Sequence, residues 1–185
     1  MEFNRDSDKW LKTANKLSFY IGLIAGGGMF VVANFQETAM IQVHLAGALT
    51  CFAAGCAYML SQAWITRRMH PLFCNLRIAY IRLAMAVIGT CLLFIAFTFG
   101  VLAAITFHRQ FPDLPTPRPW NHKFIPMPGY TYHCISAVAE WVLAVIQIAF
   151  FLSYSREFEK LHVDLTVQPL VTHLDHSPHY TDTED

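Results

Sequence analysis

The sequence predicts an all-α protein, a polytopic membrane helix bundle with four transmembrane helices. Two observations support this class: hydrophobic residues make up 55% of the 185 residues, and long, nearly charge-free runs recur along the chain. A helix needs about 20 apolar residues to cross a hydrocarbon core of about 30 Å. A soluble fold would have to bury four unusually long helices, so we expect a membrane protein. The expected spans cover residues 17–36, 39–65, 80–107 and 131–154.

The first span follows a mixed-charge segment, residues 1–16. This segment is not followed by the short apolar core and small-residue cleavage site of a signal peptide. The span itself contains a glycine run at positions 26–28. Small residues let membrane helices approach closely, so we expect this run to pack against a neighbouring helix. The turn to the second span, NFQET, contains no Lys or Arg.

The third span begins near Arg82, which we expect to snorkel to the nearer membrane interface. The loop that follows it contains six prolines between Phe107 and Tyr130, and it is therefore expected to run extended rather than helical. This loop has no cysteine, which excludes a disulfide-stapled extracellular domain and disfavours a tetraspanin or a claudin.

The distribution of Lys and Arg orients the spans. The segment before the first span and the loop between the second and third spans are rich in Lys and Arg, unlike the NFQET turn. The positive-inside bias therefore predicts that both termini face the cytosol. The expected organisation is a cytosolic N-terminal segment (1–16), a four-span membrane domain (17–155) and a disordered cytosolic tail (156–185).

Glu140 is the only formally charged side chain between Lys123 and Arg156, and it lies inside the fourth span. A central acidic charge costs about 2.5–3.5 kcal/mol on insertion scales, whereas each Leu, Ile, Val or Phe returns about 0.3–0.6 kcal/mol. The helix can therefore insert with its acid, provided that the acid faces protein or water. We expect His44, a hydroxyl or a backbone group to be its partner, rather than Arg82.

A seam of polar and small residues is expected along the second and fourth spans. Its members recur every three or four residues, which places them on one face of each helix. The seam comprises His44, Gly47, Cys51, Gly55, Glu140 and Gln147. Two interpretations remain open: a packing seam with a few interhelical hydrogen bonds, which we favour, or a polar cavity for a lipid headgroup or an ion.

Motifs for catalysis are absent from the sequence. It has no HExxH, no Cys-x-x-Cys, no Gly-rich phosphate loop and no Ser-nucleophile elbow. His173, His176 and His179 repeat every third residue of the expected tail, but this spacing alone does not indicate a metal site. No basic patch indicates nucleic acid. We therefore expect no catalytic residue, metal or cofactor, and no nucleic-acid partner.

Three short motifs lie in this order along the chain: Asn34, Phe35 and Gln36, then His44 to Gly47, then Ala139, Glu140 and Trp141. These motifs resemble those of the DNA-damage-regulated autophagy modulator family and its transmembrane-150 relatives. Their order and spacing agree with the family over roughly residues 15–165. Family members look like six-helix proteins. The resemblance therefore implies that this chain corresponds to the last four helices of an N-terminally shortened member.

The resemblance also implies a role. Family members are lysosomal or endosomal membrane factors that promote autophagy, and the transmembrane-150 relatives work at the plasma membrane. We therefore expect a modulator of autophagy that acts through membrane lipids and other membrane or autophagy proteins, not through catalysis. The alternatives are a plasma-membrane scaffold or adaptor, and a small transporter or lipid-binding protein that uses the His44/Glu140 seam.

Overall fold

The computed structural model describes residues 9–71, 75–120 and 127–159. Within these ranges the chain is helical and contains no strand. The elements are α1 (Lys9–Asn34), α2 (Ile41–Arg68), α3 (Leu76–Gln110), α4 (Tyr130–Leu152) and the short α5 (Ser155–Phe158). The chain divides into two units, Met1–Ser155 and Arg156–Asp185, and α1 to α4 all belong to the first.

Four helices are long and apolar enough to cross a membrane, which confirms the predicted all-α, four-span fold class. Each helix from α1 to α3 begins before the expected apolar span or ends after it, because polar residues continue the backbone hydrogen bonding past the apolar run. The expected tail lies outside the described residues from position 160 onward, as do the first eight residues of the expected N-terminal segment.

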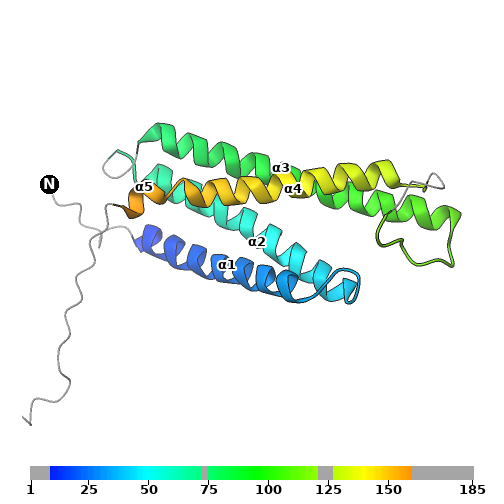
Figure 1. Ribbon diagram of the computed structural model, residues 1–185. Helices are drawn as coiled ribbons and strands as arrows, with labels where there is room; N and C mark the ends of the chain where they lie inside the picture. The colour runs from blue at the N-terminus through cyan, green and yellow to red at the C-terminus, as the bar shows by residue number, and fades with distance from the viewer. Residues whose placement is uncertain (1–8, 72–74, 121–126, 160–185) are drawn as a thin grey trace, which may run out of the picture. The chain divides into compact units, whose positions relative to one another are not determined.

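The four long helices form two hairpins, α1 with α2 and α3 with α4 (Figure 1). Helix α2 also packs along α3, whereas its contact with α4 is restricted to a few positions. Residues 35–40 form the turn between α1 and α2, closed by hydrogen bonds from the Ala39 and Met40 amides to the Gln36 carbonyl at 3.2 and 2.9 Å. Figure 1 shows that α3 continues beyond this turn. We call this end of the bundle the turn end, and the opposite one the Arg82 end.

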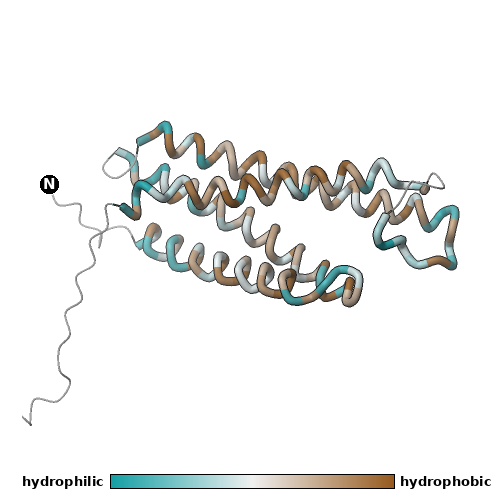
Figure 2. The backbone as a smooth tube through the Cα atoms, viewed as in Figure 1, coloured by the Kyte–Doolittle hydropathy of each residue, from teal (hydrophilic) through white to brown (hydrophobic). Residues whose placement is uncertain are grey.

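The outer faces of the helices are more apolar than a water-exposed surface allows. Large side chains such as Phe30, Trp141 and Leu152 are 68%, 75% and 66% exposed. Figure 2 shows apolar residues along all four helices and hydrophilic ones mainly towards their ends. Contiguous exposed apolar surface of this extent fits a lipid environment, in which it costs nothing to leave these side chains outside the core.

The residues just before α3 and α4 explain where these two helices begin. The Asn75 side chain caps α3 by accepting a hydrogen bond from the Arg77 amide at 3.0 Å. Gly129 precedes α4 with a φ of 84°, a conformation that side chains disfavour. A Cβ atom there would also lie 2.4 Å from the Ala103 carbonyl oxygen, so glycine lets the chain enter α4 directly against α3.

Candidate functional site

The α1–α2 contact is a close approach of two backbones. A Cβ atom at Gly28 would lie 2.5 Å from the Cys51 amide nitrogen and 2.8 Å from the Gly47 carbonyl oxygen. A Cβ atom at Gly47 would in turn lie 2.7 Å from Val31 Cγ1. Two of the expected seam residues, Gly47 and Cys51, therefore pack the first hairpin together, as small residues do in membranes.

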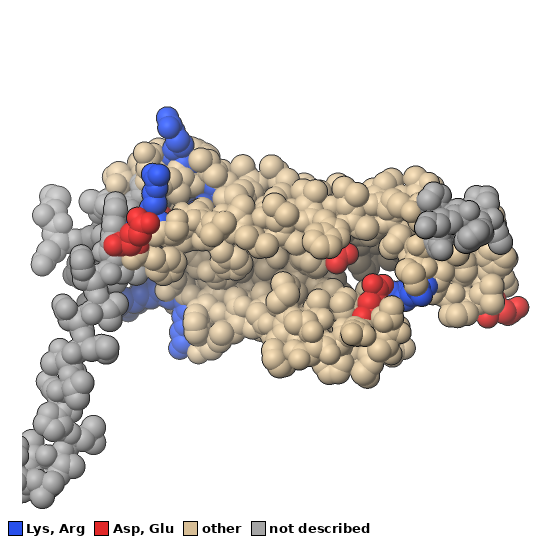
Figure 3. Space-filling view, in the orientation of Figure 1, with Lys and Arg blue, Asp and Glu red and all other residues tan. Residues whose placement is uncertain are grey.

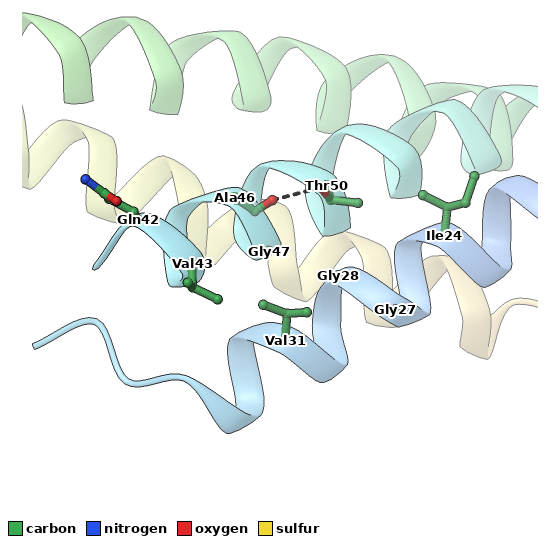
Figure 4. Close-up of a pocket in the computed structure, with 9 residues that line it drawn as sticks. All are labelled: Ile24, Gly27, Gly28, Val31, Gln42, Val43, Ala46, Gly47 and Thr50. Carbon is green, nitrogen blue, oxygen red and sulfur yellow. Dashed lines mark hydrogen bonds between the residues drawn. The ribbon is translucent and has the colours of Figure 1, made fainter. Parts of the chain in front are cut away.

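An open groove runs along the outer side of this hairpin contact. Its volume is about 530 Å³, and Figure 4 shows Val31 of α1 and Val43 of α2 projecting into it. Gly27 and Gly47 also line the groove, together with Thr50, whose hydroxyl donates to the Ala46 carbonyl at 2.8 Å. The groove is thus apolar apart from the edges of a few polar side chains.

The seam residues of α2 and α4 meet at Gly55 and Gln147. A Cβ atom at Gly55 would lie 2.5 Å from Gln147 Nε2, so this glycine makes room for the amide. Gln147 is 8% exposed, and its amide donates to the Phe52 carbonyl of α2 at 3.4 Å. Gln147 is therefore an interhelical hydrogen-bonding residue buried between the two hairpins.

Glu140 and His44 are not hydrogen bonded to each other. His44 Nδ1 instead lies 2.7 Å from the Phe35 carbonyl oxygen at the end of α1. The Glu140 side chain is exposed, and within the described part of the chain its carboxylate makes no hydrogen bond. Glu140 does lie within electrostatic reach of His44 and of Glu37 in the turn. No hydrogen bond therefore joins the expected pair in the described part of the chain.

An ion pair that sequence reasoning missed joins the turn to the segment after α3. The Arg118 guanidinium donates to the Glu37 carboxylate, and both side chains remain partly exposed. Figure 3 shows acidic atoms on both sides of a recess in this face of the bundle, with basic atoms beside one of the acidic groups. The sequence did show that Glu37 lies in a turn that contains no Lys or Arg. Its partner Arg118 lies 81 positions away, so the sequence did not identify the pair.

The structure contradicts the expectation that Arg82 snorkels, because its side chain is only 1% exposed. Its Nε donates to the Ser153 hydroxyl at 3.0 Å, one Nη to the Ser153 carbonyl at 2.9 Å and the other Nη to the Thr66 hydroxyl at 3.1 Å. The guanidinium also lies 3.4 Å from the centre of the Tyr154 ring, within cation–π range. Helix α3 begins six residues before Arg82, which places this residue inside the bundle instead of at its rim.

Hydrogen bonds extend this polar region to α1. The Ser18 and Ser61 hydroxyls lie 2.8 Å apart, and the Gln62 amide donates to Ser18 at 3.0 Å. The Tyr154 hydroxyl then donates to Gln62 Oε1 at 3.4 Å. We call this group the Arg82 cluster, which comprises Ser18, Ser61, Gln62, Thr66, Arg82, Ser153 and Tyr154. It links all three longest helices and the residues that follow α4 at the Arg82 end.

An apolar core separates the Arg82 cluster from the polar groups at the turn end. Its most buried members are Met59, Ala86, Leu143 and Phe150, each at 0% exposure. Over the described residues, no group of three or more His, Cys, Asp or Glu side chains is placed to hold a metal. Within the described residues, the side chains of this core interrupt the polar seam.

The motif residues in the turn have structural roles. The Asn34 amide donates to the Phe30 carbonyl at 2.7 Å, Phe35 supplies the carbonyl bound by His44, and the Gln36 carbonyl closes the turn. Trp141, by contrast, points outward and is 75% exposed. The Asn34–Gln36 motif thus shapes the end of the first hairpin.

The apolar exterior, the four long helices and the interrupted polar seam define a multi-pass helical membrane protein. The family of the Frag1/DRAM/Sfk1/Cwh43P N-terminal domain matches residues 1–161, so the chain belongs to this family. This agrees with the resemblance inferred from the short motifs.

Relatives within the family are named as autophagy modulators. The chain is 31% identical over 160 residues to DNA damage-regulated autophagy modulator protein 2 of Bos taurus, covering 84% of this chain and 58% of the relative. It is also 31% identical to DNA damage-regulated autophagy modulator protein 1 of Xenopus laevis, over 83% of this chain and 59% of the relative. It is 29% identical to the modulator of macroautophagy TMEM150B of Danio rerio, covering 83% and 55%. The chain thus spans little more than half the length of these relatives, and no solved structure matches it significantly.

Proposed function

We propose that this protein modulates autophagy from within a lysosomal or endosomal membrane, through contacts with lipids and other proteins and not through catalysis. The observation that carries the proposal is the family match over residues 1–161, with relatives whose names describe modulators. The plasma membrane is the alternative compartment, where the same surface would serve a scaffold or adaptor.

The polar residues of the bundle support a non-catalytic role. The seam residues Gly47, Gly55 and Gln147 are engaged in helix packing, and the Arg82 cluster is enclosed by its own hydrogen bonds. The large apolar exterior offers contact area for lipid and for membrane-embedded partners. Beyond His44 and Glu140, Gln147 lies within an apolar core around Met59 and Leu143, an arrangement that disfavours a transporter that depends on the His44/Glu140 pair.

A flux measurement in cells tests the proposal. Cells that lack the gene are compared with cells that re-express the chain at its normal level, and turnover of an autophagic cargo is measured with and without lysosomal inhibition. We expect re-expression to change the flux, and fractionation to place the chain with lysosomal or endosomal membranes. Unchanged flux at normal membrane levels of the protein would contradict the role, and plasma-membrane enrichment would favour the scaffold alternative.

A further inference from the structure

Exposed basic side chains gather at the Arg82 end of the bundle, where Figure 3 shows several basic groups. They are Lys9, Lys12 and Lys16 on α1, Arg67 and Arg68 in the last turn of α2, and Arg77 at the start of α3. The acidic side chains of residues 9–155 all lie elsewhere: Glu37 in the turn, Asp113 after α3 and Glu140 midway along α4. Among the described residues of the first unit, this end therefore carries an excess of positive charge.

The turn end, by contrast, carries charges of both signs. Its described cations are Arg109 and Arg118, and its described acids are Glu37 and Asp113. Arg118 is also ion paired with Glu37. The two ends of the described bundle therefore differ in net charge, and the excess of basic side chains belongs to the Arg82 end.

Hydrogen bonds between three helices bring the basic segments together. The Ser18 hydroxyl of α1 lies 2.8 Å from the Ser61 hydroxyl of α2, so the first turns of α1 run beside the last turns of α2. Arg82 donates to the Thr66 hydroxyl at 3.1 Å, so the first turns of α3 lie beside the same part of α2. All the exposed cations of this end lie within about three helical turns of these hydrogen bonds.

Both arginines of α2 lie over aromatic rings. The Arg67 guanidinium lies 5.7 Å from the centre of the Tyr80 ring, and the Arg68 guanidinium lies 5.4 Å from that of Trp64. All four side chains are exposed. Because Trp and Tyr rings prefer the level of the lipid headgroups, the two guanidinium groups lie at that level as well. A ring occupies one face of a guanidinium and leaves the in-plane N–H donors available to phosphate oxygens.

We propose that the Arg82 end binds anionic phospholipids of the phosphatidylserine type, through the phosphate and carboxylate groups of their headgroups. Clusters of about four to eight Lys and Arg beside a transmembrane helix attract such lipids, and the attraction grows with each cation. The positive-inside bias predicts that this end faces the cytosol, and the cytoplasmic leaflet is the one that contains anionic lipids. We thereby name one headgroup class among the lipid contacts of the proposed function, on which this inference rests.

Spin-labelled lipids test this preference on the full chain in phosphatidylcholine bilayers. A trace of phosphatidylserine or phosphatidylcholine with a labelled acyl chain is added, and electron paramagnetic resonance separates lipids slowed by the protein from bulk lipids. We expect a larger slowed fraction for phosphatidylserine at low salt. The difference should shrink at about 1 M salt, where the Debye length is about 3 Å. Equal fractions at low salt would contradict the proposal while leaving the autophagic flux, which is measured separately, as the test of the proposed function.

Charge-neutralising variants locate the preference on the molecule. One variant combines Lys9→Gln, Lys16→Gln, Arg67→Gln and Arg68→Gln, and its control is Arg109→Gln at the turn end; all five side chains are exposed. The combined variant should reduce the slowed fraction of phosphatidylserine to that of phosphatidylcholine, whereas the control should retain the difference. If the combined variant does not fold, Lys9→Gln with Lys16→Gln gives the same test as a partial loss. An undiminished preference in these variants, or an equal loss in the control, would overturn the assignment to the Arg82 end.

Discussion

At the scale of single residues, the main contrast is between two charges in apolar helices. Arg82 is enclosed and hydrogen bonded by Thr66 and Ser153, whereas Glu140 is exposed and unbonded among the described residues. A buried charge is tolerated when hydrogen bonds replace its lost hydration, and removing its partners is strongly destabilising. Arg82 therefore contributes to the assembly of the bundle, while Glu140 is available for another role.

Replacing Arg82 by Lys should destabilise the protein. Lysine keeps the charge but lacks the planar fork that reaches Thr66 and Ser153 together. Losing hydrogen bonds to a charged group costs about 1.5–3 kcal/mol, so we expect a clearly lower midpoint of thermal unfolding in detergent. Arg77→Lys is the matched control on the same helix, because Arg77 is exposed. Equal midpoints for the two variants would show that the Arg82 hydrogen bonds do not stabilise the fold.

Glu140→Gln should leave the stability of the protein nearly unchanged. The amide has the size of the carboxylate, and no described hydrogen bond is lost. Surface substitutions of this kind usually change the free energy of unfolding by no more than about 0.5 kcal/mol. The measurement is the same thermal unfolding in detergent, at neutral pH. A large decrease would mean that Glu140 is a packing element after all.

At the scale of helices, the first hairpin depends on glycines whose surroundings differ sharply. Gly28 lies against the backbone of α2, whereas nothing lies within 4 Å of a Cβ atom at Gly26 or Gly27. The sequence could predict that the glycine run packs against a neighbour, but it could not show which of the three glycines makes the contact. A run of identical residues covers several directions around a helix, and only the position of α2 selects one of them.

Substitution by alanine distinguishes these glycines. Gly28→Ala should destabilise the protein by about 1–3 kcal/mol, because the added carbon overpacks a backbone contact. Gly26→Ala should be neutral or stabilising, since alanine in a helix is favoured over glycine by about 1 kcal/mol and the site is open. Thermal unfolding of the two variants side by side is the measurement. Equal destabilisation by both would contradict the described α1–α2 contact.

Helical spacing shows which residues share a face, but not which helix they contact, and this difference explains which parts of the candidate site were predictable. Helical spacing was enough to identify Gly47, Gly55 and Gln147 as one seam, and the structure brings Gly55 and Gln147 together. The partner of Arg82 was not predictable, because its burial depends on where α3 begins and on the approach of α4. The Glu37–Arg118 pair was equally hidden, since it joins segments that only the packing of two hairpins brings together.

At the scale of the whole molecule, the positive-inside bias makes a prediction about topology. We expect tags at both termini to be digested by protease once the plasma membrane is selectively permeabilised. An epitope placed beside Asp113 should remain protected until all membranes are opened, if the chain resides in an internal membrane. Protection of the N-terminal tag, or early digestion of the epitope beside Asp113, would overturn the proposed orientation.

The unequal lengths of α1 and α3 have a consequence for the surrounding lipids. Their charge-free parts, residues 17–34 of α1 and 83–107 of α3, correspond to about 27 and 38 Å of helix. A hydrocarbon core of about 30 Å matches the first but is thinner than the second, so the membrane thickens beside the second hairpin or α3 tilts. Each of these adjustments costs a fraction of a kcal/mol per Å of mismatch. Acyl-chain length, which sets the thickness of the bilayer, is therefore expected to affect the tilt of α3 in the membrane, independently of any partner protein.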